Sequence, residues 1–118
     1  MDSPRPPGKT TIDSGVLLTI ARLTTLSVDG VSRMSEVPGN VRNIFKRNHD
    51  QGVRIEVEDS LVDVDVYVVL EENSDIRSVS REIQGEISRS IGDMVGMSVG
   101  RINVHIEDID YTDNNEAE

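Results

Sequence analysis

The sequence predicts a two-layer α+β fold, in which two main helices pack on one face of a single, mainly antiparallel sheet of about four strands. Three patterns support this prediction. Two segments repeat aliphatic residues every three or four positions, two neighbouring segments alternate aliphatic with polar residues, and one more alternating segment follows near the C-terminus. Such alternation is typical of antiparallel strands with one wet face, so the helices are expected to cover the other face.

The chain length and composition predict one folded domain with short flanking segments. The chain has 118 residues, which is near the usual size of one domain. Residues 1–9 hold three of the four prolines and predict a flexible N-terminal lead. The domain itself is expected over residues 10–109, and the acidic residues 110–118 predict a flexible tail.

The first helix is expected from residue 11 to about residue 29. Its apolar residues recur at helical spacing, and Asp13 or Ser14 stands where a helix needs an N-cap. The residues that carry this pattern are Val16, Leu17, Ile20, Ala21, Leu23 and Val28. A short strand over residues 30–34 is expected to follow, because apolar and polar residues alternate there.

A hairpin and a final strand supply most of the predicted sheet. Residues 53–58 and 62–70 alternate aliphatic with polar residues, and a tight connection at Asp59 and Ser60 joins them. The last strand is expected over residues 99–106. Its inward-facing residues are Ile102, Val104 and Ile106, and its outward-facing residues are Arg101, Asn103 and His105.

A long helix is expected over residues 76–94, where one apolar stripe repeats every three or four positions. Asn73 or Ser74 is placed to cap its start, and Gly96 is expected to end it in the left-handed conformation. Two interior glycines each weaken the helix by about 0.5–1 kcal/mol relative to alanine, so the close approach of another backbone is one expected compensation. These glycines are Gly85 and Gly92.

The stretch over residues 36–51 is the least regular part of the domain, and it holds a local basic cluster. Pro38 marks a turn, and Val41, Ile44 and Phe45 predict one short helix. The cluster is suited to an acidic protein, lipid headgroups or RNA, whereas ordinary surface charge is the alternative interpretation. The candidate partner-binding residues are Arg42, Lys46 and Arg47, with Arg33 and Arg54 nearby in the sequence.

The acidic composition disfavours several classes of partner. A net charge of -10 opposes binding to phosphate backbones and anionic lipid, so nucleic acid is disfavoured. Aromatic residues make up 3% of the chain, which leaves little for stacking on bases. No segment approaches the length of a membrane span, and the start lacks the apolar core of a signal peptide. We therefore expect a cytoplasmic protein that does not insert directly into a membrane.

The sequence contains no recognisable motif for catalysis or cofactor binding. It lacks cysteine, the nucleophile elbow of hydrolases, the phosphate-binding loops of nucleotide enzymes and the paired-histidine helix of zinc proteases. His105 is interpreted as an exposed or edge histidine, and the acidic residues of the hairpin as the solvated sheet face, with a metal site as the alternative. These acidic residues are Glu56, Glu58, Asp59, Asp63 and Asp65. No catalytic, cofactor-binding or metal-binding residue is therefore predicted.

Several short features, taken in order along the chain, point to a family. They are Gly30-Val31 with Met34, Gly52-Val53 at the start of the hairpin, the strand VDVDVYVVL, Ile83-Gln84 in the long helix, and the ending VGMSVGRINVHIEDI. Over residues 12–109 the chain resembles the alkaline shock protein (general stress protein) family. One departure is the loop EENSD, where the family pattern suggests a Tyr-Gly-like turn.

This resemblance implies a cytoplasmic protein of mainly Gram-positive bacteria that is linked to cell-envelope stress. It also implies a non-enzymatic interaction or scaffold module, which associates with itself and is recruited to the inner face of the membrane by a small anchor protein. Two alternatives stay open. One is a small RNA-binding module of the KH type, although no GXXG loop lies between two helices here, and the other is a regulatory subunit of a metabolic enzyme such as one in fatty-acid synthesis.

Overall fold

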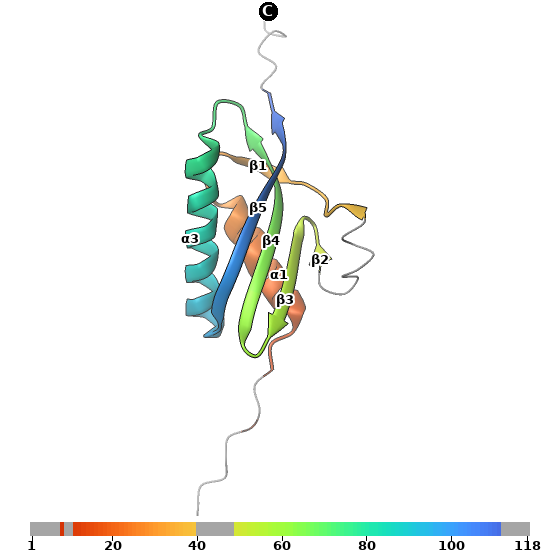
Figure 1. The fold of residues 1–118 in the computed structure, drawn as a ribbon, viewed down its shortest axis with the longest axis vertical. Helices are drawn as coiled ribbons and strands as arrows, with labels where there is room; N and C mark the ends of the chain where they lie inside the picture. The colour runs from red at the N-terminus through yellow and green to blue at the C-terminus, as the bar shows by residue number, and fades with distance from the viewer. Residues whose placement is uncertain (1–7, 9–10, 40–48, 112–118) are drawn as a thin grey trace, which may run out of the picture.

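The computed structural model, which describes residues 8, 11–39 and 49–111, has two layers. A five-stranded sheet forms one layer, and two helices lie together against one of its faces (Figure 1). Three of the strand pairings are antiparallel and one is parallel. The predicted fold class is therefore confirmed. The predicted lead over residues 1–9 and tail over 110–118 lie largely outside the described residues, so these boundaries stay predictions.

Helix α1 spans Ser14–Leu26 and follows the apolar repeat of the sequence. Asp13 is its N-cap, as predicted, and its Oδ1 accepts a hydrogen bond of 2.8 Å from the amide of Gly15. The inner side of the helix is buried against the sheet, so its apolar surface leaves water. The buried residues of α1 are Leu17, Leu18, Ala21 and Thr25.

Strand β4, Leu61–Glu71, is the central strand of the sheet. Strand β3, Val53–Glu58, pairs antiparallel with its first half, and strand β1, Val31–Met34, pairs antiparallel with its second half. Both lie along the same edge of β4, because β5 occupies the other edge. The two-residue strand β2, His49–Asp50, pairs with the outer edge of β3.

Strands β1 and β3 continue one another end to end, although residues 35–52 separate them in the sequence. The amide of Ser35 donates to the carbonyl oxygen of Tyr67 at 2.7 Å, and the amide of Tyr67 donates to the carbonyl oxygen of Gly52 at 2.8 Å. At Gly52, φ is +85° and a Cβ atom would lie 2.3 Å from the Ser35 carbonyl oxygen. Glycine is required at this junction because no side chain fits.

The β3–β4 turn forms where the sequence predicts it. Asp59 and Ser60 have φ values of 52° and 70°, so both lie in the left-handed region that two-residue hairpin turns require. This turn fixes the register in which Val57 faces Val62 and Ile55 faces Val64. As a result, the valines of β4 at even positions all point toward the helices.

Helix α3 spans Ile76–Val95, close to the predicted range, and Gly96 ends it at φ 72° as expected. The predicted cap is wrong, because the side chain that caps the helix is Asp75, which accepts from the amide of Ser78 at 3.2 Å. Asn73 instead adopts φ 68° in the turn before the helix, and Ser74 Oγ donates to the carbonyl oxygen of Gly30 at 3.4 Å. Both candidates are therefore engaged elsewhere.

Strand β5, Ser98–Asp110, runs parallel to β4 along its whole length. A parallel pair needs a crossover between its strands, and α3 provides it. The strand extends four residues beyond the predicted end at residue 106. The sequence pattern misses this extension because the added residues pair through their backbone, and Asp110 is held by side chains of β1.

The core lies between the helices and the inner face of the sheet, and it is aliphatic in a chain whose aromatic residues make up 3%. Its fully buried members include Leu17, Ala21, Val53, Ile55, Val62, Val64, Val66, Val68, Leu70, Ile83, Ile87 and Ile91. No backbone approaches the two interior glycines of α3 within the described residues, because a Cβ atom at Gly85 or Gly92 would meet nothing within 4 Å. The expected compensation is therefore absent from this part of the chain. The predicted short helix around Val41 lies outside the described residues.

Candidate functional site

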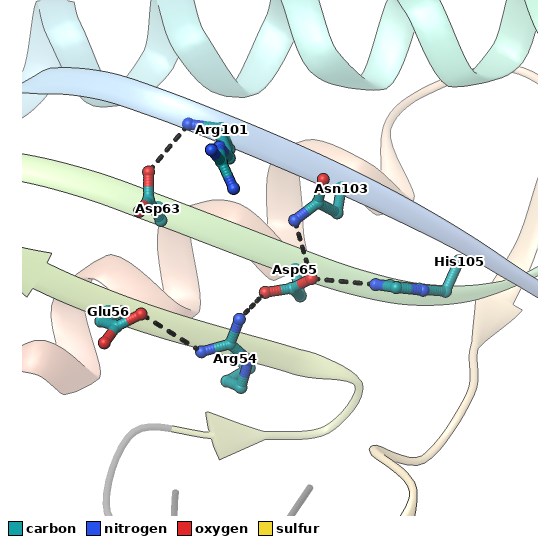
Figure 2. Close-up of polar contacts among 7 residues, drawn as sticks. All are labelled: Arg54, Glu56, Asp63, Asp65, Arg101, Asn103 and His105. Atoms are coloured by element: carbon teal, nitrogen blue, oxygen red, sulfur yellow. Dashed lines mark hydrogen bonds and ion pairs between the residues drawn. The ribbon is translucent and has the colours of Figure 1, made fainter.

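The sheet face opposite the helices carries a compact cluster of polar side chains (Figure 2). Alternate residues of three neighbouring strands meet there, with Arg54 from β3, Asp65 and Tyr67 from β4, and Asn103 and His105 from β5. Asp65 and Tyr67 are 4% and 5% exposed, so this face is crowded at its centre. We call these five residues the open-face cluster.

Asp65 is the centre of the open-face cluster. Its Oδ2 accepts a hydrogen bond from Arg54 Nη2, which forms an ion pair across β3 and β4. Its Oδ1 accepts from Asn103 Nδ2 at 3.1 Å and lies 2.9 Å from His105 Nε2. Both carboxylate oxygens are thus engaged, and the guanidinium supplies the compensating charge that a buried carboxylate needs.

Tyr67 and His105 stack at the other end of the cluster. Their ring centroids lie 4.4 Å apart and their planes differ by 10°. Burial raises the pKa of the Tyr67 hydroxyl, and the negative charge of Asp65 raises it further. The phenol therefore stays neutral throughout the physiological range.

Asp63, two residues before the centre, has a structural role at the edge of the same face. Its Oδ1 accepts from the amide of Arg101 at 2.8 Å, where the register between β4 and β5 shifts. A Cβ atom at Gly100 would lie 2.5 Å from that oxygen. The carboxylate thus occupies the space that glycine leaves, and it satisfies a backbone donor of the bulge.

The solvated-face interpretation of the acidic residues is correct for Glu56, Glu58 and Asp59, which are exposed, and wrong for Asp65. Alternation shows which face a residue occupies, but it does not show what lies across the neighbouring strands. Here the side chains of Arg54 and Asn103 close over the carboxylate. His105, interpreted as an exposed or edge residue, is a half-exposed partner of the same carboxylate.

The geometry of the open-face cluster suits cross-strand stabilisation and recognition. Asp65 makes three contacts, which tie its carboxylate on β4 to one side chain of β3 and two of β5. In the part of the chain that the structure describes, no three acidic, histidine or cysteine side chains come together in a way that could hold a metal ion. Only the register, which pattern analysis does not provide, brings these five residues together.

The basic residues singled out in the sequence divide into two groups. Arg42, Lys46 and Arg47 lie outside the described residues. Arg33 is described, and its Nε donates to Asp110 Oδ2 at 3.0 Å, which Ser32 Oγ also contacts at 2.6 Å.

The hydrogen bonds from Arg33 and Ser32 lower the pKa of the Asp110 carboxyl, with Arg33 the larger cause. Arg54 pairs with Asp65 in the open-face cluster. The guanidinium groups of Arg33 and Arg54 are therefore both engaged in ion pairs within the chain, and the candidate site of Arg42, Lys46 and Arg47 stays a prediction.

A groove lies at the end of the molecule where α1 begins, and sequence reasoning missed it. It has a volume of about 600 Å³. Its lining comes from the start of α1, the β3–β4 turn and the end of α3, and includes Ile12, Leu17, Val57, Val95 and Met97. The alternation along β3 does not show that this end is open, although Val57, the last inward residue of the strand, is 45% exposed in the structure.

Comparison with known proteins identifies the family. The model of the alkaline shock protein 23 family, described as having a cell envelope-related function, matches residues 3–111. The chain belongs to this family. The resemblance found in the sequence is therefore confirmed, and with it a cell envelope-related function.

Two curated relatives of this alkaline shock protein family member come from bacteria. The uncharacterized protein YqhY of Bacillus subtilis is 32% identical over 106 residues, which cover 88% of this chain and 78% of the relative. The uncharacterized protein Spy1614 of Streptococcus pyogenes serotype M6 is 28% identical over 83 residues, which cover 70% of this chain and 69% of the relative. No solved structure matches the chain.

Neither α1 nor α3, the helices of the described ranges, is both long and apolar enough to span a membrane.

Proposed function

We propose that this protein is a non-enzymatic interaction module of the cell envelope, which associates with itself and is recruited by a membrane-anchored protein from the cytoplasmic side. Membership of a family with a cell envelope-related function supports the cellular setting. The contacts of Asp65 support a structural use of the one carboxylate in the open-face cluster, because they join side chains of β3, β4 and β5.

The observation that carries this proposal is the outer edge of β5. The strand spans thirteen residues and pairs with β4 on one side, while no other described strand pairs with its second side. Unpaired amide and carbonyl groups along a strand are a template for strand addition by another chain. Helix α3 packs along β5 on this side (Figure 1), and Gln84 Nε2 donates to the carbonyl oxygen of Ile102 at 3.0 Å, so the edge is partly engaged at this position.

The side chains along β5 define what such a partner would meet. Ile102, Val104 and Ile106 are half-buried and face the helix layer, whereas Glu107 and Asp108 are exposed near the end of the strand. An extended segment that alternates apolar and basic residues fits this row. A segment of this kind from a membrane-anchored protein would complete the sheet and hold the module at the membrane.

A site-specific photocrosslinking experiment in the native cell tests the proposal. A photoreactive amino acid at Glu107, exposed on β5, is compared with the same amino acid at Arg81, exposed on α3. We expect Glu107 to form an adduct with a protein of the membrane fraction and Arg81 to form much less of it. Equal adducts at both positions would contradict docking at β5, and an adduct confined to a soluble metabolic enzyme would favour the regulatory-subunit alternative.

A further inference from the structure

Helix α1 is apolar on two sides, although it needs only one to pack on the sheet. Leu17, Leu18 and Ala21 are buried in the core. On the outer side Val16 is 47% exposed and Leu23 is 54% exposed, so large aliphatic side chains face water. A helix on the surface of a monomer normally carries polar residues on that side.

The outer side of α1 repeats with the spacing of a coiled coil. Its residues follow one another at intervals of three, four and three, which are the intervals between a and d positions of a heptad. We call this row the α1 stripe, and it consists of Val16, Thr19, Leu23 and Leu26. All four are exposed.

A shallow groove accompanies the α1 stripe. It has a volume of about 490 Å³ and is lined by Asp13, Gly15, Val16, Thr19 and Ile20. The missing side chain at Gly15 leaves room beside Val16 and Thr19. A side chain from a facing helix can enter this space as a knob, which is how a and d residues pack.

The charge of the helix indicates which partner fits the α1 stripe. Between Ser14 and Leu26 the one ionisable side chain is Arg22, whereas the whole chain has a net charge of -10. Two copies of so acidic a protein repel each other over most of their surface. The repulsion is smallest where the two surfaces in contact both lack acidic side chains. A basic partner would bind more favourably to the acidic surfaces of the protein than to the α1 stripe.

We propose that two copies of the protein pair through the α1 stripe, with each stripe packed against the same stripe of the other copy about a two-fold axis. Such a contact is isologous, so one apolar row supplies both sides of it. This inference rests on the self-association in the proposed function and assigns it to a surface. It leaves β5 open for the membrane-anchored partner.

Light scattering and sedimentation equilibrium of the full chain test this pairing. The substitution Leu23→Glu puts a charge on the α1 stripe at a residue that is 54% exposed, so the core keeps its packing. Ser88→Glu, at an exposed position of α3, adds the same charge elsewhere and is the matched control. We expect a dimer for wild type and for Ser88→Glu, and a dissociation constant raised by about tenfold or more for Leu23→Glu, with an unchanged circular dichroism spectrum.

A mixture of charge variants sharpens the test. Leu23→Glu and Leu23→Lys are each expected to pair weakly alone, and their equimolar mixture is expected to form a heterodimer because the contact then holds opposite charges in place of like charges. If the wild type is a dimer and Leu23→Glu does not weaken it, the assignment of the contact to α1 is wrong and self-association stands. A wild type that is monomeric at every concentration would overturn both the pairing and the self-association, whereas the photocrosslinking result at Glu107 would still decide recruitment.

Discussion

Arg54 on β3 donates from its Nη2 atom to Oδ2 of Asp65 on β4, and this pair joins two strands on the face of the sheet that the helices leave open. The side chains are 14% and 6% exposed, so water contributes little to the solvation of either charge. Neither partner can be removed without leaving the other charge largely buried.

Replacing Arg54 with methionine is therefore expected to destabilise the protein by about 3 kcal/mol, because a buried carboxylate loses its counter-charge. Urea unfolding followed by circular dichroism measures this loss. Arg81→Met on the exposed side of α3 is the control, and we expect it to change stability by less than about 0.5 kcal/mol. A double variant, Arg54→Met with Asp65→Val, is expected to recover much of the loss; equal losses in the single and double variants would contradict a buried ion pair.

The interior glycines of α3 predict stabilising substitutions. Gly85→Ala and Gly92→Ala are each expected to raise the free energy of unfolding by about 0.5–1 kcal/mol, because a Cβ atom at either position meets nothing within 4 Å. Thermal unfolding of the full chain measures the gain.

Gly52→Ala is the opposing control for these substitutions. Its Cβ atom would lie 2.3 Å from the carbonyl oxygen of Ser35 at a residue with φ +85°, so the substitution is expected to destabilise. If Gly85→Ala or Gly92→Ala lowered stability in the same way, α3 would be packed against something beyond the described residues.

The Arg33–Asp110 ion pair predicts a dependence of stability on pH. The pKa of Asp110 is lowered in the folded state, mainly by the hydrogen bond from Arg33, so the unfolded chain takes up the proton first as the pH falls. The pair therefore stabilises the protein above the ordinary Asp pKa of 3.8, and this contribution is lost as the pH falls through the lower pKa of the folded state.

Comparison of wild type with Asp110→Asn isolates this contribution. The wild type is expected to be more stable at pH 7, and the difference between the two is expected to shrink as the pH falls below about 4. Asp93→Asn, in an exposed part of α3, is the control and is expected to show no loss at neutral pH. A difference that stays constant down to pH 2 would show that Asp110 acts without its charge.

Tyr67 predicts a separate titration at high pH. In the variant Tyr111→Phe it is the one remaining tyrosine, since the chain has two. Burial raises its pKa, so its phenolate absorbance is expected to appear above the ordinary tyrosine pKa of 10.0. A tyrosine pKa that is higher in the folded than in the unfolded state stabilises the folded protein below pH 10, and this contribution is lost as the pH rises through the folded pKa. Unfolding is therefore expected to accompany the titration. Phenolate absorbance at or below pH 10 in the folded protein would contradict the buried position.

The sequence predicts those parts of the fold that local patterns determine. Period-two alternation finds β3 and β4, and the short polar step at Asp59 and Ser60 correctly places their turn. Period-3.6 spacing finds α3, and Gly96 correctly marks its end. In each case the residues that decide the structure lie within a few positions of one another.

The parts that the sequence does not predict depend on contacts between distant segments. The burial of Asp65 requires the register of β3 and β5 against β4, which sets Arg54 and Asn103 beside it. The true end of β5 at Asp110 depends on Arg33, 77 positions earlier in the chain. Asp75 caps α3 because Ser74 faces Gly30, which is another long-range contact. Local patterns contain none of this information.

The end-to-end arrangement of β1 and β3 makes residues 36–51 an insertion into one edge of the sheet. The hydrogen bonds from Ser35 to Tyr67 and from Tyr67 to Gly52 hold the two ends of this insertion side by side. Both bonds are made by the backbone of one residue, so Tyr67 joins β1 and β3 into a single line along β4 and supplies by hydrogen bonds the continuity that the covalent chain does not.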